Sequence, residues 1–207
     1  MARVVVTRAR GQEEALVSAL RAEGHEVSHV PLIAIEPVGE GPVDVTGFDW
    51  VVVTSVNGAH ELRRRMRGRP VRVAAIGRAT AAALGGADLV PRVSSQEGLL
   101  AELPRPAGRV LFAAAEGARR LLPDALGAET VTLYRTVELE PAGLEGDLVV
   151  LASPSAARAL GRIAERPPAV SIGPETTRAA HAAGVVVRAE ARTHDLDGLV
   201  AAVAEAL

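Results

Sequence analysis

The chain has 207 residues, of which 48% are hydrophobic and only 2% aromatic, so that Ala, Val and Leu must build the core. Its 23 basic and 25 acidic residues are interspersed, and a net charge of -2 gives no field of one sign that would attract nucleic acid or an anionic membrane. Lysine and cysteine are both absent, which excludes a Schiff-base lysine, a thiol nucleophile, a disulfide framework and a thiolate metal site.

The chain begins with an apolar strand that has Thr7 and Arg8 at its end and is followed by a helical pattern. No charged leader precedes a long apolar core, and no run of 18 apolar residues occurs, so we expect a soluble cytoplasmic protein. A guanidinium at the end of this strand suits bidentate contact with a carboxylate. A solvated arginine at a strand end is an equally simple interpretation.

One supersecondary pattern occurs twice, at an offset of roughly 96 to 106 residues. Residues 3–37 show a strand, a glycine-containing turn, a helix, a second strand and an alternating segment that ends in Glu-Pro, and residues 109–141 repeat this order. Further matched pairs are 51–62 with 149–160, 71–90 with 168–187, and 94–103 with 192–207. Strands of about five residues that alternate with helices of about ten to twelve predict an α/β fold with parallel sheets. Right-handed crossovers would bring every strand-to-helix loop to one edge of its sheet.

Four strand-to-helix turns carry small residues where a ligand can bind. They contain Ser55; Gly77 and Thr80; Ser153 and Ser155; and Gly173, Thr176 and Thr177. Free N–H groups at a helix N-terminus, together with the helix dipole, favour a carboxylate or a phosphate, and glycine lets the backbone approach it closely. Serine and threonine are also ordinary N-caps, which is the simpler interpretation of any single turn. The matching of the turns in pairs favours an anion site.

The sequence lacks the motifs typical of nucleotide-binding and metal-binding sites. The sequence contains neither GxGxxG nor GxxxxGK[ST], so NAD and ATP have little support, and it contains no HExxH. The five histidines are scattered without metal-ligand spacing. The sole tyrosine, Tyr134, lies where a strand enters the second alternating segment, and a half-buried structural ring is the alternative to a catalytic role.

Two domain divisions are compatible with the repeat. A cut at residues 106–108 would give two consecutive domains. Alternatively, the alternating segments at about 31–37 and 134–141 are paired connectors, through which the chain leaves one lobe and later returns to it.

The motifs VVVTR, LIAIEP, VVVTSVNG, AAIGRATAAAL, LYRT, VVLASPSAA and SIGPETTRAAHAAG, in this order, resemble the uroporphyrinogen-III synthase family over nearly the full chain. The chain departs from the family pattern after Arg8, where a proline is missing, and at Gly58, where Ala is more usual. The resemblance implies two flavodoxin-like parallel-sheet lobes joined by a two-stranded connector. One lobe would comprise residues 1–35 plus 140–207 and the other residues 36–139.

The resemblance also implies an activity: a lyase that cyclises hydroxymethylbilane to uroporphyrinogen III with inversion of the last ring and loss of water. It implies no cofactor and no metal, and a substrate that is a linear tetrapyrrole with eight carboxylates. Tyr134 would assist the loss of the hydroxyl. The substrate-binding residues would be Thr7, Arg8, Ser55, Gly77, Thr80, Ser153, Ser155, Gly173, Thr176 and Thr177.

We expect a monomer that binds neither nucleic acid nor membrane, and a transient contact with the preceding pathway enzyme stays open. Two other functions compete with the synthase. A non-catalytic two-lobed binding protein or sensor for a small polyanion would use the same turns. An enzyme acting on sugar phosphates lacks an obvious base, because Asp49 and Asp147 precede strands and so lie away from the ligand edge.

Overall fold

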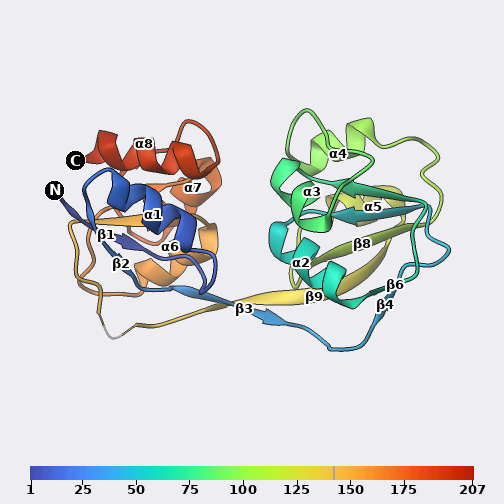
Figure 1. The fold of residues 1–207 in the computed structure, drawn as a ribbon, viewed down its shortest axis with the longest axis horizontal. Helices are drawn as coiled ribbons and strands as arrows, with labels where there is room; N and C mark the ends of the chain where they lie inside the picture. Colours follow the sequence, from blue (N-terminus) through green and yellow to red (C-terminus); the bar gives the residue numbers. More distant parts are fainter. Residues whose placement is uncertain (142) are drawn as a thin grey trace. The chain divides into compact units, whose positions relative to one another are not determined.

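The computed structural model describes residues 1–141 and 143–207. The chain folds into two compact units, whose helices and strands are labelled in Figure 1. Unit 1 comprises Met1–Ala34 and Thr136–Leu207, and unit 2 comprises Ile35–Arg135. Both are built on parallel sheets with helices, so the α/β class predicted from the sequence is confirmed.

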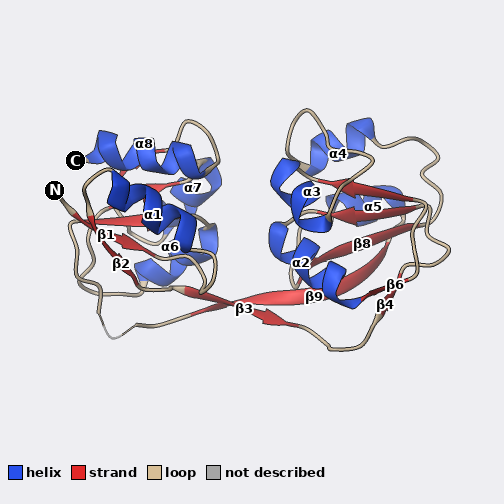
Figure 2. Ribbon diagram, in the orientation of Figure 1, coloured by secondary structure: helices blue, strands red, loops and turns tan. Residues whose placement is uncertain are grey.

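Unit 1 contains a five-stranded sheet in the order β12-β11-β10-β1-β2, with all four strand pairs parallel (Figure 2). Its elements are β1 (Arg3–Val6), α1 (Glu14–Ala22), β2 (Glu26–His29), β10 (Leu148–Leu151), α6 (Pro154–Gly161), β11 (Ala169–Ser171), α7 (Pro174–Ala182), β12 (Val187–Glu190) and α8 (Leu196–Ala206). Because the strands are parallel, the loops after β1, β10 and β11 all leave from one edge, here called the carboxyl edge.

The core of unit 1 follows the two-residue period of its strands. Val4 and Val6 of β1 face the core formed with α1 and α8. Val5, between them, points to the opposite face and is also fully buried. Strands buried on both faces need continuous apolar runs, which explains why β1 and β10 contain only aliphatic residues after Arg3.

Unit 2 contains a five-stranded sheet in the order β3-β9-β8-β5-β7 and a small pair, β4-β6. Its elements are β3 (Ile33–Pro37), β4 (Val43–Asp44), β5 (Trp50–Val53), α2 (Val56–Arg65), β6 (Met66–Arg67), β7 (Arg72–Ala75), α3 (Arg78–Leu84), α4 (Gln96–Glu102), β8 (Val110–Ala115), α5 (Leu121–Leu126) and β9 (Glu129–Glu138). One face packs on α2 and the other on α4 and α5. The helices of both units have 6 to 11 residues, so several are shorter than the sequence pattern predicted.

Strands β3 and β9 each extend across the boundary between the units. Val38 N donates to Leu133 O, and Leu139 N donates to Leu32 O. From Leu32 to Val38 the residue number rises along the first segment, while that of its partner falls from Leu139 to Leu133, so this pairing is antiparallel. Glu36 and Arg135 form a 2.8 Å ion pair on the same two strands.

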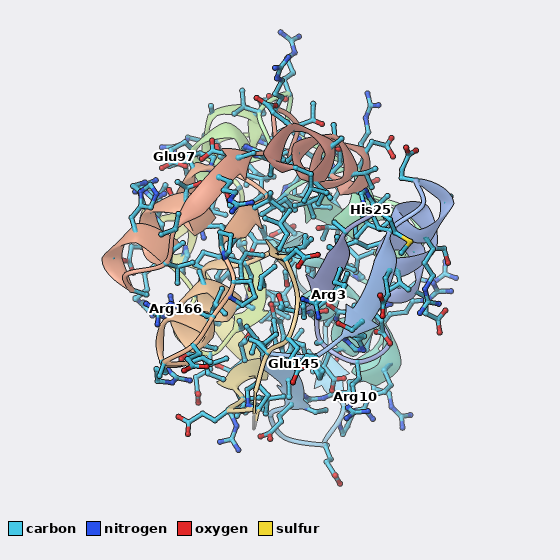
Figure 3. The ribbon with its side chains drawn as sticks, turned by 90° about the vertical axis from the view of Figure 1, so that its left-hand side faces the viewer. Arg3, Arg10, His25, Glu97, Glu145 and Arg166 are labelled. Carbon is cyan, nitrogen blue, oxygen red and sulfur yellow. The ribbon has the colours of Figure 1, made fainter. Side chains whose placement is uncertain are left out.

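Two aspartates anchor the opposite edge of the sheets. Asp147 Oδ2 accepts from Arg3 N at 2.8 Å in unit 1, and Asp49 Oδ2 accepts from Arg109 N at 2.7 Å in unit 2. The hydrogen bonds from Arg3 hold the pKa of Asp147 below its usual value. Figure 3 labels Arg3, beside which Glu145 and Arg166 line an open pocket of about 410 Å³. Both aspartates therefore join strand beginnings and lie away from the carboxyl edge, as the sequence indicated.

Gly161, the last residue of α6, packs closely against Ala183 at the end of α7. A Cβ at this position would lie 2.5 Å from Ala183 Cβ and 2.7 Å from Ala183 O. We expect Gly161→Ala to destabilise the protein by about 1–3 kcal/mol, because α6 and α7 would have to separate. In a chain of this size each kcal/mol lowers Tm by about 2–4 °C. Thermal melts should show this loss, whereas the control Gly143→Ala, with no atom within 4 Å of its added Cβ, should melt like the parent. Equal melting of the two variants would contradict the packing argument.

Candidate functional site

The loop after β1 carries two of the predicted residues, and they have different environments. Thr7 is fully buried, and its Oγ1 donates to Val150 O at 2.7 Å. Its only hydroxyl proton thus joins β1 to β10 in this structure. Arg8 is partly buried, and no hydrogen bond or ion pair to its guanidinium is found in the described part of the chain. Burial lowers the pKa of Arg8, while the nearby carboxylate of Glu13 opposes this shift.

His29, at the end of β2, supports the Arg8 loop. Its Nε2 donates to the carbonyl oxygen of Arg8 at 2.8 Å, and its Nδ1 lies 3.4 Å from Glu13 Oε1. The sequence did not single out either His29 or Glu13. Together they fix the backbone that presents Arg8 at the carboxyl edge.

The first turn of α6 holds two serines whose hydroxyl groups both accept hydrogen bonds. Ser153 is the N-cap and accepts from Ala156 N at 3.2 Å. Ser155 accepts from Arg158 Nη2 at 2.9 Å. Because a hydroxyl also has one proton to donate, N-capping does not prevent either serine from contacting a ligand. No hydrogen bond donated by these two hydroxyls is found among the described residues.

Gly173 is the N-cap of α7, and the ring of His194 packs against it. A Cβ on Gly173 would lie 2.7 Å from His194 Nε2, so only glycine leaves room for this ring. Thr176 is only 2% exposed.

Thr177 anchors the first turn of α7 to the sheet. Its Oγ1 lies 2.5 Å from Ser171 Oγ and donates to Glu190 Oε2. Thr177 is thus joined to β11 through Ser171 and to β12 through Glu190.

In unit 2, the structure brings Tyr134 and Ser55 together although they are 79 residues apart. The Tyr134 hydroxyl donates to Ser55 Oγ at 2.9 Å, and Ser55 Oγ, the N-cap of α2, also accepts from Gly58 N at 3.0 Å. Tyr134 lies opposite Ala115, the last residue of β8, and β8 pairs with β5, whose end precedes Ser55. Tyr134 is 7% exposed, and burial raises the pKa of its phenol, against a smaller opposite effect of Ser55.

The remaining predicted residues of unit 2 surround the start of α3. Gly77 is its N-cap, and a Cβ there would lie 3.1 Å from Ser94 Oγ. Thr80 is 4% exposed within the helix. Gly77 and Ser94 thus correspond to Gly173 and His194 of unit 1.

The sequence repeat could have identified Ser94 and His194. Each directly precedes an N-cap, Ser95 or Asp195, that accepts from the N–H of a glycine three residues later. The contacts of Glu190 with Thr177 and of His29 with Arg8 have no counterpart in the sequence repeat, because they depend on which strands are neighbours in the sheet.

The described residues contain no cluster of three or more His, Asp or Glu side chains that could hold a metal ion. Within the same residues, no helix is both long and apolar enough to cross a membrane.

Known proteins resemble this chain in sequence and in fold. A curated uroporphyrinogen-III synthase of Synechococcus elongatus is 30% identical over 146 residues, which are 61% of this chain and only 55% of that relative's length. The crystal structure of a mutant uroporphyrinogen III synthase from the extremely thermophilic bacterium Thermus thermophilus has a TM-score of 0.64 at 19% identity, covering 100% of this chain and 98% of that one. At that identity the structural likeness shows the fold alone. The family model of uroporphyrinogen-III synthase HemD matches residues 14–201, and the chain therefore belongs to the uroporphyrinogen-III synthase family.

Proposed function

We propose that this protein is a uroporphyrinogen-III synthase, which closes hydroxymethylbilane to uroporphyrinogen III with inversion of the last pyrrole ring and release of water. Beside the family membership, one observation carries the proposal: the hydrogen bond from the Tyr134 hydroxyl to Ser55. It places the only tyrosine at the carboxyl edge of unit 2, next to the N-terminus of α2. Ligands of open parallel sheets bind at this edge.

We further propose that the two units are flavodoxin-like lobes and that β3 and β9 are their connector. In unit 1 the five strands, numbered in chain order, follow the arrangement 2-1-3-4-5. In unit 2, β5, β7, β8 and β9 follow 2-1-3-4, and β3 takes the fifth place. The antiparallel hydrogen bonds of β3 and β9 support their role as a two-stranded connector.

The substrate's carboxylates are proposed to bind at the carboxyl edge of each unit. In unit 1, Arg8 supplies a charged donor, and Ser153 and Ser155 supply hydroxyl protons. In unit 2, the turns at Ser55 and Gly77 offer hydroxyl and backbone N–H groups. Thr7 and Thr177 contribute by holding strands and α7 in place, because their protons are engaged inside unit 1.

For the reaction, Tyr134 is proposed to redirect its hydrogen bond from Ser55 to the leaving hydroxyl of the substrate. The C–O bond breaks with its electron pair on oxygen, the pyrrole nitrogen supplies the compensating electron pair, and the oxygen leaves as water after protonation. The resulting azafulvene is an electrophile that alkylates amines and thiols. The chain contains neither lysine nor cysteine, and hydroxyl side chains are poor nucleophiles at neutral pH.

Product analysis tests the function directly. Hydroxymethylbilane is generated in solution, the protein is added, and the products are oxidised and separated as type I and type III uroporphyrins. Predominantly type III product would support the synthase. If a folded sample gave only type I, the spontaneous product, the synthase function would be refuted and a polyanion-binding protein would be the remaining interpretation.

A further inference from the structure

We propose that Arg158 is a substrate-binding residue that forms, together with Ser155, a carboxylate-binding site on the first two turns of α6. The proposal rests on the synthase function and adds a residue that the sequence motifs did not indicate. It concerns one carboxylate of the tetrapyrrole substrate.

Arg158 hydrogen-bonds within α6 and also joins α6 to β9. Its Nη2 donates to Ser155 Oγ at 2.9 Å, and its Nε donates to Glu138 Oε1 at 2.9 Å. Ser155 lies one helical turn before Arg158, and Glu138 is the last residue of β9. Arginine side chains on a helix lean toward its N-terminus, which explains why the guanidinium reaches Ser155.

The hydrogen bond from Arg158 determines what Ser155 can offer a ligand. A serine hydroxyl has one proton to donate and two lone pairs to accept with. A guanidinium has no acceptor, so in this contact Ser155 only accepts and its proton is not used. Its proton stays available for an anion, and donation from a cation strengthens the hydroxyl as a donor.

The guanidinium itself also keeps unused donors. Of its five N–H groups, Nε and one on Nη2 are engaged with Glu138 and Ser155. The side chain is 53% exposed, whereas Glu138 is only 22% exposed. Glu138 therefore helps to orient the guanidinium, and no contact of its Nη1 is found among the described residues, so that a carboxylate can contact Ser155 and Arg158 together.

Arg162 provides a matched control on the same helix. It also pairs with Glu138, and its Nε lies 3.3 Å from Glu140. Its side chain is 43% exposed, and it carries the same charge as Arg158. It lies a further turn from Ser155, so its removal changes the ion pairs of β9 and the net charge but leaves the Ser155 contact intact.

The test is a steady-state comparison of Arg158→Ala, Arg158→Lys and Arg162→Ala with hydroxymethylbilane as substrate. Arg158→Ala should raise KM about tenfold, equivalent to about 1.4 kcal/mol, with kcat nearly unchanged. Arg158→Lys should recover only part of the affinity, because an ammonium cannot bond Glu138, Ser155 and a carboxylate in the same planar arrangement. Arg162→Ala should leave KM close to that of the parent.

Titration of each variant with uroporphyrin I, an octacarboxylate, gives a second readout that does not need turnover. Affinity should fall in Arg158→Ala, and in a Ser155→Ala background the same change should have a smaller effect, since the two residues act together. Equal losses in Arg158→Ala and Arg162→Ala would overturn the proposal in favour of net charge or the β9 ion pairs, as would an unchanged KM in Arg158→Ala. Formation of type I product alone by the parent protein would instead refute the synthase function.

Discussion

Replacing Tyr134 by Phe is expected to lower kcat about 100-fold, at the low end of the range for a positioned proton donor. The reason for the low end is burial, which raises the pKa of Tyr134 and makes the phenol a weaker acid than usual. KM should change little, because the hydroxyl assists bond breaking and not substrate binding. Single-turnover formation of uroporphyrinogen III, followed in both proteins, measures this effect.

The pH dependence of the parent protein provides an independent check. A raised pKa keeps the phenol protonated as the pH rises to its usual value of about 10. Ionisation of Tyr134 should therefore cause no fall in kcat between neutral pH and a pH of about 10. A fall in kcat at lower pH would have to come from the ionisation of another group.

Ser55→Ala is the control for the environment of Tyr134. It removes the acceptor of the phenol's hydrogen bond and the N-cap of α2, but it keeps the phenol itself. We expect a smaller loss of kcat than in Tyr134→Phe, together with about 1 kcal/mol lower stability from the missing cap. A fully active, folded Tyr134→Phe variant would show that the ring is only structural.

Arg8→Gln is expected to raise KM about 10- to 100-fold, because a hydrogen bond involving a charged group contributes about 1.5–3 kcal/mol and about 1.4 kcal/mol corresponds to a factor of ten. The guanidinium is the candidate carboxylate ligand after β1, and its partial burial strengthens its interaction with an anion. Steady-state kinetics with hydroxymethylbilane would measure KM. The effect should decrease as salt is added.

Two further variants separate a specific contact from general charge. Arg10→Gln makes the same charge change two residues later at an exposed position, labelled in Figure 3, and should leave KM nearly unchanged. Arg8→Lys should recover part of the affinity, since lysine retains the charge but not the bidentate geometry. Similar increases of KM in Arg8→Gln and Arg10→Gln would contradict a role for Arg8 in binding.

The sequence predicted those features of the candidate site that depend on local chain geometry. Ser55 and Ser153 follow apolar strands directly, and each was expected near the N-cap of the next helix, where the structure shows both. For Thr7 and Thr177, the sequence indicates the position of the hydroxyl group but not its hydrogen-bond partner. A hydroxyl at a strand end is visible in the sequence, but the engagement of its proton with Val150 or Glu190 is not.

The α/β class and the alternation of strands and helices follow from local patterns in the chain, because hydrophobic period and capping residues act over only a few positions. The contact of Tyr134 with Ser55 and the contacts of Arg158 with Ser155 and Glu138 could not be read from those patterns and required the folded structure. The Tyr134 contact depends on the placement of β9 beside β8 and of β8 beside β5. Such neighbours are set by the packing of whole elements over long sequence separations, which no local pattern specifies.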